Sequence, residues 1–322
     1  MNNPIFTSIF AVHIQDFLKW KGSLGYKPNS YMRTLLLFDM FCNKNQIEEP
    51  HISKDLYLKW VSSMTNNSIK TINNKCSVIK QLSIYLTNKG IASYIPRHFK
   101  KEIKNYTPYI FAEDQILLLF KQADKLNPYN NRSDSFVFSF PALLRTLYAM
   151  GLRIHEATSL NDADVDIKTG TILIEMSKNG QQRILPMSDS LKLVLSQYVE
   201  MKSKLKLAGT KDGSSPFFIA PNGKRLEDSA IYYMFKRLLN KCNIPHLGGK
   251  KGPHLHHLRH SFAVHTLAKQ VRNGTDMYCS LPYLMSFLGH RSIEGTETYV
   301  KLTNDMFSEI MNDIDDSLED FF

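Results

Sequence analysis

A basic stretch without helical periodicity, residues 96–108, divides this chain of 322 residues into two segments. It begins and ends with proline, holds three lysines, and lacks apolar residues that recur at three- or four-residue steps. Boundaries between domains fall in polar, proline-containing segments of this kind. A chain of this length is long enough for two ordinary domains. We therefore predict one domain over residues 1–105, a linker around residues 96–108, and a second domain over residues 109–322.

The first segment carries four runs of apolar residues at helical spacing. The first run begins at Ile5 and stops at Gly22, and the second follows residues 28–30. Ser53 and Ser68 precede the third and fourth runs, where a serine hydroxyl can accept a hydrogen bond from an otherwise unpaired backbone N–H. No strand pattern interrupts these runs. The first segment is therefore predicted to be a small helical bundle.

The second segment mixes helical and strand patterns. Two short strand candidates, residues 171–176 and 183–186, are joined by a turn that contains Asn-Gly, a dipeptide favoured in tight hairpins. Helices are predicted after the acidic pair at 113–114, where negative charge meets the positive end of the helix dipole, and over residues 136–150, 191–206, 227–242 and 257–270. The whole chain is therefore predicted to be mostly α with a small β-sheet, an α+β protein.

Positive charge is spread over both segments. The net charge is +10, and residues 1–105 hold 15 Lys and Arg against 6 Asp and Glu. Residues 302–322 hold none against 7, so the tail is acidic. A basic surface favours a polyanionic partner, because each neutralised phosphate releases condensed counterions. The composition thus points towards nucleic acid without establishing it.

The N-terminus and the cysteines indicate the cellular compartment of the protein. The N-terminus lacks the pattern of a secretory signal, and no apolar run approaches the roughly 20 residues that span a bilayer. The four cysteines are scattered and form no close pair, as is usual for thiols in a reducing compartment. We expect a cytoplasmic protein with no membrane partner.

Six residues supply what phosphodiester cleavage without a metal requires. Arginine donates planar, bidentate hydrogen bonds to phosphate oxygens, tyrosine can attack phosphorus, and histidine or lysine can move protons. The candidates are Arg153, Lys178, His256, Arg259, His290 and Tyr299. Glu156 and His260 are supporting candidates, because Glu156 lies at i+3 from Arg153 and His260 directly follows Arg259.

Each candidate also has an ordinary structural interpretation. Arg153 and Glu156 could form a simple ion pair, and we interpret them as both structural and functional. Lys178 could be an exposed turn lysine, and Tyr299 a half-buried tyrosine. His256 and His260 share a helical face and would suit a metal, but no cysteine or carboxylate close in sequence completes a site. We therefore expect neither a metal nor a cofactor, and the prediction depends on all six residues occurring together.

The motifs around these residues resemble those of the tyrosine recombinases of the phage integrase family. They are GLRIHEATSL around Arg153, the hairpin with Lys178, His256-x-x-Arg259 followed by His260, LGH ending at His290, and Tyr299 nine residues later. The resemblance covers the whole chain and implies a helical core-binding domain followed by a catalytic domain.

The resemblance also implies a role for each residue. Arg153, Arg259 and His290 would bind the scissile phosphate, and Tyr299 would become joined to the 3′ phosphate. Lys178 would protonate the departing 5′ oxygen, and His256 would assist proton transfer. Cleavage and religation would need neither a metal nor ATP.

The biological role has several candidates. The stretch QVRNGTDMYCSLPY between Arg259 and His290 looks longer than in compact members and resembles the branch found in mobile elements, which implies an integrase or transposase. The alternatives are a chromosome-dimer resolvase, a type IB topoisomerase, a catalytically silent DNA-binding protein and a metalloprotein.

The partners follow from the same resemblance. We expect double-stranded DNA recombination sites, a homo-tetramer on DNA, an accessory directionality factor, and action at the bacterial nucleoid. The tail, residues 305–322, carries apolar residues at helical spacing, so we predict a helix that docks onto a neighbouring protomer.

Overall fold

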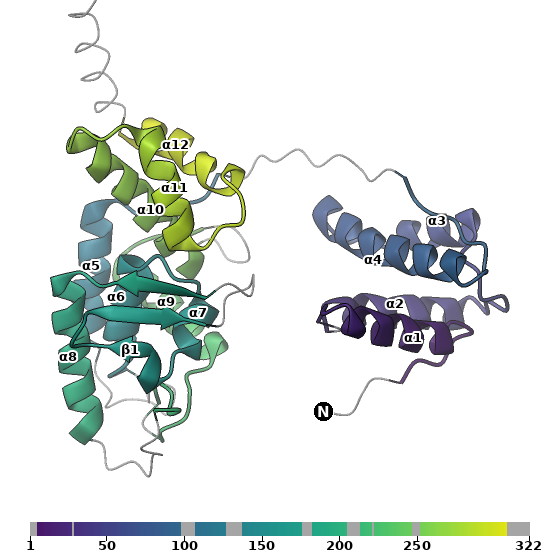
Figure 1. Cartoon of the computed structure of the whole chain (residues 1–322), viewed down its shortest axis with the longest axis horizontal. Helices are drawn as coiled ribbons and strands as arrows, with labels where there is room; N and C mark the ends of the chain where they lie inside the picture. Colours follow the sequence, from purple (N-terminus) through teal and green to yellow (C-terminus); the bar gives the residue numbers. More distant parts are fainter. Residues whose placement is uncertain are drawn as a thin grey trace, which may run out of the picture. The chain divides into compact units, whose positions relative to one another are not determined.

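The computed structural model describes residues 5–27, 29–97, 107–126, 137–175, 182–204, 213–220, 222–246 and 252–307. It consists of two compact units, Met1–Tyr106 and Thr107–Phe322, called unit 1 and unit 2 below. Each is considered by itself (Figure 1). Within the described ranges, every helix is too short or too polar to cross a bilayer.

Unit 1 is a helical bundle. Its helices are α1 (Ala11–Ser23), α2 (Asn29–Lys44), α3 (Lys54–Ser62) and α4 (Ile69–Asn88). α4 packs against both α1 and α2, and aromatic rings fill much of the core. The predicted caps of the third and fourth helices are confirmed: Ser53 Oγ accepts the Leu56 N–H at 3.1 Å and Ser68 Oγ accepts the Thr71 N–H at 3.3 Å.

The first helix starts later than predicted. It begins at Ala11, and Ile5, the predicted start, is 82% exposed. The backbone N–H groups of Thr7 and Ser8 instead donate to the buried carboxylate of Asp39 on α2, at 2.9 and 3.0 Å. A side chain that satisfies the backbone in this way competes with helix formation, so the segment before α1 is tied to α2.

Unit 2 confirms the predicted α+β class. Its helices are α5 (Glu113–Asp124), α6 (Phe140–Ala149), α7 (Ile154–Ser159), the 3₁₀ turn η3 (Asp162–Asp164), α8 (Asp189–Lys204), α9 (Asp228–Lys241), α10 (Leu255–Arg272), α11 (Met277–Leu288) and α12 (Glu294–Met306). Its strands are β1 (Val165–Asp166), β2 (Thr171–Ile174) and β3 (Arg183–Pro186). They form an antiparallel sheet in the order β1-β2-β3. The two predicted strands are β2 and β3, whereas β1 was not predicted.

The register of the hairpin turns a charged residue inward. Leu185 pairs with Ile172 and Arg183 pairs with Ile174, and both isoleucines are buried. Because pairs directly opposite each other in an antiparallel sheet share a face, Arg183 lies on the inner face. Ile184 faces outward and is 68% exposed. Positions 183 and 184 of β3 therefore invert the usual pattern of apolar residues inside and polar residues outside, whereas Leu185 follows it.

Helix α10 joins the two hydrophobic clusters of unit 2. Its first turns contribute Leu255 and Leu258 to a large cluster with α5, α6, α8 and α9. Its later turns, from Ala263 onward, belong to a second cluster with α11 and α12. Arg259 lies at the change from one cluster to the other, and α10 also packs against α6, α11 and α12 (Figure 1).

Two further expectations concern the C-terminal part. Most of the stretch QVRNGTDMYCSLPY is helical: α10 continues to Arg272, and α11 begins at Met277, where its N-cap Asp276 accepts the Cys279 N–H at 2.9 Å. No helix was predicted beyond residue 270 in this stretch. The predicted tail helix, residues 305–322, lies almost entirely outside the described residues; Tyr299 itself is on α12, which ends at Met306.

Asp39→Asn should destabilise unit 1. The amide keeps one acceptor oxygen but turns an NH₂ group towards backbone N–H donors, and a buried donor without a partner costs about 1–3 kcal/mol. Both tryptophans, Trp20 and Trp60, lie in unit 1, so urea unfolding followed by tryptophan fluorescence reports on this unit. The exposed Asp55→Asn is the control and should change the free energy of unfolding by less than about 0.5 kcal/mol. Equal effects of the two variants would contradict the role of Asp39.

Candidate active site

A buried carboxylate gathers three arginines in unit 2. Glu156 on α7 is 3% exposed. Its Oε1 lies 2.8 Å from Arg153 Nη1, and its Oε2 lies 3.0 Å from Arg183 Nη2 and 3.9 Å from Arg259 Nη1. Its Oε2 also accepts the Arg153 backbone N–H at 3.0 Å. Burial alone would raise the pKa of Glu156, but hydrogen bonds from Arg183 and Arg153 lower it overall. The carboxylate is therefore ionised and holds the guanidinium groups in place.

Arg259 is held by carbonyl groups from two separate segments. Its Nη1 donates to Gly151 O and its Nη2 donates to Leu288 O, both at 2.8 Å, and the residue is 1% exposed. Burial, and then the charge of Arg153, lower the pKa of Arg259 to about 10. The group thus stays protonated at neutral pH while its direction is fixed by backbone atoms.

Glycines in two of the motifs allow this close packing. Gly151 has φ +55°, and a Cβ there would lie 2.5 Å from Cδ1 of Phe262. Gly289 has φ +66° and ends α11, and a Cβ there would lie 2.9 Å from Nη1 of Arg183. Both positions demand a backbone conformation that favours glycine. The GLR and LGH motifs therefore place a glycine where a side chain would push an arginine or its packing partner away.

Tyr299 projects from α12 into this network. It is 3% exposed, and its hydroxyl lies 3.0 Å from His260 Nδ1. Its ring stacks on His290, with centroids 6.2 Å apart and an interplanar angle of 18°. Burial raises the pKa of Tyr299, while the charges of Arg259 and Arg153 and a hydrogen bond with Arg259 oppose that rise.

Burial keeps the histidines of the site neutral. Burial, and then neighbouring histidines and Arg259, lower the pKa of His260 to about 3. Burial and Arg259 lower the pKa of His290 to about 4, and His290 Nδ1 lies 2.9 Å from Thr296 Oγ1. The ring of His256 meets the ring of His260 edge-on at 4.7 Å. Among the described residues, no group of three or more His, Cys, Asp or Glu side chains is arranged to hold a metal.

The structure brings most of the predicted site together. Ion pairs join Arg153, Glu156 and Arg259, and a hydrogen bond joins His260 and Tyr299. The charge of Arg259 acts on the Tyr299 hydroxyl, and ring contacts add His256 and His290. Lys178 lies outside the described residues. Arg183 was not among the predicted site residues, although one signal was present in the predicted strand 183–186: its alternation puts Arg183 on the same face as Leu185.

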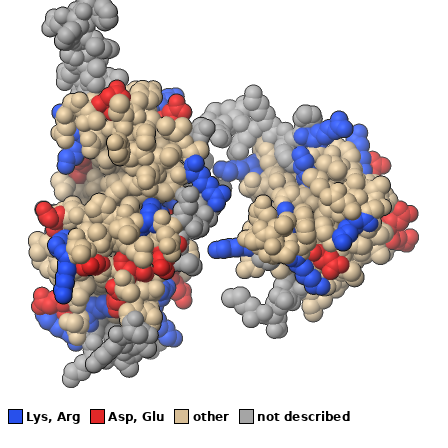
Figure 2. Space-filling model, in the orientation of Figure 1, with Lys and Arg blue, Asp and Glu red and all other residues tan. Residues whose placement is uncertain are grey.

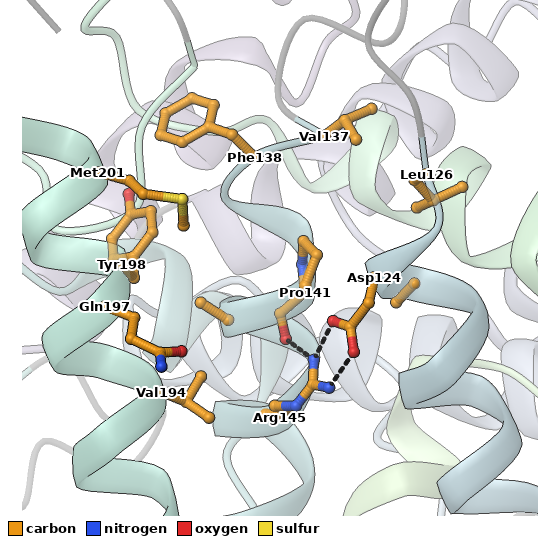
Figure 3. Close-up of a pocket in the computed structure, with 12 residues that line it drawn as sticks. Asp124, Leu126, Val137, Phe138, Pro141, Arg145, Val194, Gln197, Tyr198 and Met201 are labelled. Carbon is orange, nitrogen blue, oxygen red and sulfur yellow. Dashed lines mark hydrogen bonds and ion pairs between the residues drawn. The ribbon is translucent and has the colours of Figure 1, made fainter. Parts of the chain in front are cut away.

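The network is separate from the hollow shown in Figure 3. That hollow, of about 400 Å³, lies between the end of α5, the start of α6 and the middle of α8. An ion pair lies beside it, with Arg145 Nη1 and Nη2 donating to the two carboxylate oxygens of Asp124 at 2.9 and 2.7 Å. The described residues that line it include none of the predicted catalytic residues.

Unit 2 should lose stability as the pH falls from 7 to 5. A folded-state pKa of about 3, as for the buried His257 and for His260, lies below the unfolded value of about 6.5. Below pH 6.5 these histidines therefore bind protons in the unfolded chain but stay neutral in the folded chain. The free energy of unfolding then falls by about 1.4 kcal/mol per pH unit for each such histidine. This window lies above the range in which carboxylates titrate.

Calorimetry of unit 2 unfolding at pH 7 and pH 5 would measure this loss. His257→Gln should flatten the pH dependence, because it removes one of the two histidines whose pKa burial lowers to about 3. A midpoint that stays constant between pH 7 and pH 5 would show that these histidines are not held neutral.

Comparison with known proteins identifies the family. The family model described as "Phage integrase family" matches residues 110–306. A putative integrase/recombinase of Sinorhizobium fredii is 26% identical over 97% of this chain and 99% of its own length. The tyrosine recombinase XerD of Oceanobacillus iheyensis is 30% identical over 73% of this chain and 72% of its own length.

Solved structures share the fold. A site-specific recombinase XerH bound to its difH substrate aligns with a TM-score of 0.64 and 20% identity, over 92% of this chain and 82% of that one. A Tn1549 transposon integrase in complex with circular intermediate DNA aligns with a TM-score of 0.64 and 20% identity, over 89% of this chain and 94% of that one. With the family model matching most of the chain and the tyrosine, histidines and arginines joined in one network, the chain belongs to the phage integrase family, the tyrosine recombinases, which cleave and rejoin DNA.

Proposed function

We propose that this site-specific recombinase cuts and rejoins DNA through a covalent bond between Tyr299 and a 3′ phosphate. The observation that carries the proposal is the environment of the Tyr299 hydroxyl: it lies 3.0 Å from His260 Nδ1, and the positive charges of Arg259 and Arg153 act to lower its pKa. Arg153 approaches the same place through Glu156. A nucleophile, a proton acceptor and two fixed cations thus converge within one network.

The arginines supply the electrostatic part of catalysis. Negative charge grows on the non-bridging oxygens as phosphorus becomes five-coordinate, and fixed donors stabilise that charge without reorganising. We assign this role to Arg153 and Arg259, with His290 as a third donor to the phosphate. Arg259 uses backbone carbonyls for only two of its donors, so the others can face the phosphate and the hydroxyl of Tyr299.

The proton moves from Tyr299 to a neutral histidine. As the bond from the Tyr299 oxygen to phosphorus forms and the bond to the 5′ oxygen breaks, His260 accepts the tyrosine proton and His256 assists. Lys178 delivers a proton to the 5′ oxygen. The 5′ hydroxyl of a partner strand reverses these steps, so the phosphotyrosyl bond retains the energy for religation and neither ATP nor a metal is required.

Unit 1 is proposed as the core-binding domain. Its segment of the sequence is strongly basic, and Figure 2 shows Lys and Arg side chains at several places on the face in view, with fewer Asp and Glu. Such charge neutralises backbone phosphates irrespective of sequence. In the proposed complex, both units contact duplex DNA.

Integration, excision or transposition of a mobile element is the proposed biological role. It is supported by the relative called integrase/recombinase, which matches this chain over nearly the full length of both proteins. Chromosome-dimer resolution is the second candidate, because relatives named XerC and XerD match about three quarters of the chain. Either reaction would take place at the bacterial nucleoid in a tetramer, with the tail contacting the next protomer and a directionality factor as partner.

Tyr299 should form the covalent adduct. The substrate is a duplex that the protein enriches from a random-sequence pool, nicked close to the cleavage position so that the cut strand diffuses away. Wild-type protein should give a complex that survives denaturant without added metal, and Tyr299→Phe should give none. A complex of undiminished yield from Tyr299→Phe would rule out Tyr299 as the nucleophile.

Replacing Arg153 and replacing Lys178 should slow cleavage for different reasons. Arg153→Ala removes stabilisation of the transition-state charge and should slow cleavage about 10²–10³-fold. Lys178→Ala removes the acid, so a substrate with sulfur at the 5′-bridging position, a better leaving group, should restore its rate. The same substrate should leave Arg153→Ala slow. Equal restoration of both variants would contradict this division of roles, which single-turnover cleavage rates measure directly.

A further inference from the structure

Arg183, on the hairpin that carries Lys178, contacts two separate parts of the site although it is not one of the predicted site residues. Its Nη1 and Nη2 donate to the two oxygens of Glu156 at 3.3 and 3.0 Å, and its Nε donates to Phe287 O at 3.0 Å. The guanidinium also fills the space beside Gly289, where an added Cβ would lie 2.9 Å from Arg183 Nη1. We propose that Arg183 is a positioning residue for DNA cleavage, one that fixes Glu156 and the end of α11 and through them aims Arg153 and His290. This inference rests on the proposed function.

The placement of Arg183 costs hydrophobic packing in β3. At Arg183 a charge faces the interior beside Ile174, while the neighbouring Ile184 is turned to solvent. The Arg183 side chain is only 11% exposed. Burying an arginine costs several kcal/mol unless it is paired and hydrogen-bonded, and departures from the ordinary strand pattern tend to occur at functional sites.

The first path of action runs through Glu156 to Arg153. The carboxylate accepts two hydrogen bonds from Arg183 and two from Arg153, one of them from the backbone N–H at the start of α7. The bidentate pair with Arg183 fixes the plane of the carboxylate. Without Arg183, Glu156 is free to rotate towards Arg259, whose Nη1 lies 3.9 Å away, and the direction of Arg153 is lost with it.

The second path runs through the end of α11 to His290. Arg183 and Arg259 bind consecutive carbonyls, Phe287 O and Leu288 O, in the last turn of α11. Those carbonyls have no partner within the helix, and cations there are favoured by the helix dipole. Gly289 turns the chain directly after this contact and His290 follows. Arg183 thus fixes the last turn of α11, and through it the position of His290.

The net charge of this network favours the transition state of cleavage. Three guanidinium groups around one carboxylate leave an excess of two positive charges in a buried network. A phosphodiester neutralises one of them, and the doubly charged five-coordinate transition state neutralises both. Arg183 therefore adds to the preference for the transition state over the ground state, which is the condition for a rate effect.

The test measures rate and affinity separately. Single-turnover cleavage of the nicked duplex at saturating protein should fall about 10²-fold in Arg183→Gln, the size expected when reacting groups are misplaced by about 1 Å. The dissociation constant for the intact duplex should stay within about 3-fold of wild type. Arg183→Lys, which keeps the charge but not the fork, should fall between Arg183→Gln and wild type.

Arg145→Gln is the matched control. Arg145 makes the same bidentate contact with a carboxylate, Asp124, in the same unit but beside the hollow of Figure 3. Calorimetry gives the folded fraction of each variant. At equal folded fraction Arg145→Gln should cleave at the wild-type rate. If Arg183→Gln fails to fold, the cleavage rate and dissociation constant of Arg183→Lys are compared with wild type instead.

A double mutant separates positioning from an independent effect. If Arg183 acts through Glu156, Arg183→Gln combined with Glu156→Gln should be about as slow as the slower single variant, because the two changes break one unit. Multiplied losses, a loss in affinity equal to the loss in rate, or wild-type rates in both Arg183 variants would overturn the proposal. Absence of a covalent complex with wild-type protein would instead contradict the proposed function.

Discussion

The buried carboxylate of Glu156 is the interaction on which the rest of the site depends. Three guanidinium groups within 4 Å of one carboxylate would repel one another if the carboxylate were removed. Their hydrogen bonds outweigh the effect of burial and keep the pKa of Glu156 low. The carboxylate holds a set of mutually repelling cations in order, and in the proposed mechanism the excess positive charge is neutralised in full only by the dianionic transition state.

Helix α10 connects that electrostatic arrangement to the hydrophobic core. Leu258 packs in one cluster and Ala263 in the other, with Arg259 and His260 between them. Packed helices hold side-chain directions more precisely than loops, so the proton acceptor and one cation of the proposed mechanism are fixed by the same helix. α12 then needs only to bring Tyr299 against α10, where His260 and Arg259 meet its hydroxyl.

Local patterns predicted much of this, and the failures have physical causes. The Arg153–Glu156 pair follows from i, i+3 spacing and is confirmed, as are the Ser53 and Ser68 caps. The first helix was predicted to begin too early, because apolar spacing from Ile5 cannot show that Asp39, far along the chain, binds the backbone of Thr7 and Ser8. Arg183 was missed because its partners lie 27 and 104 residues away.

The sequence by itself determined the family, the α+β class and the residues with the right chemistry, because side-chain type and spacing are local properties of the chain. Tertiary structure decided what those residues touch. Burial set the direction of each pKa shift at His260, His290 and Tyr299. Long-range packing chose His260 as the partner of the Tyr299 hydroxyl and brought Arg183 to Glu156. These choices depend on the distances between α7, β3, α10 and α12, which are fixed only when the hydrophobic clusters of unit 2 assemble.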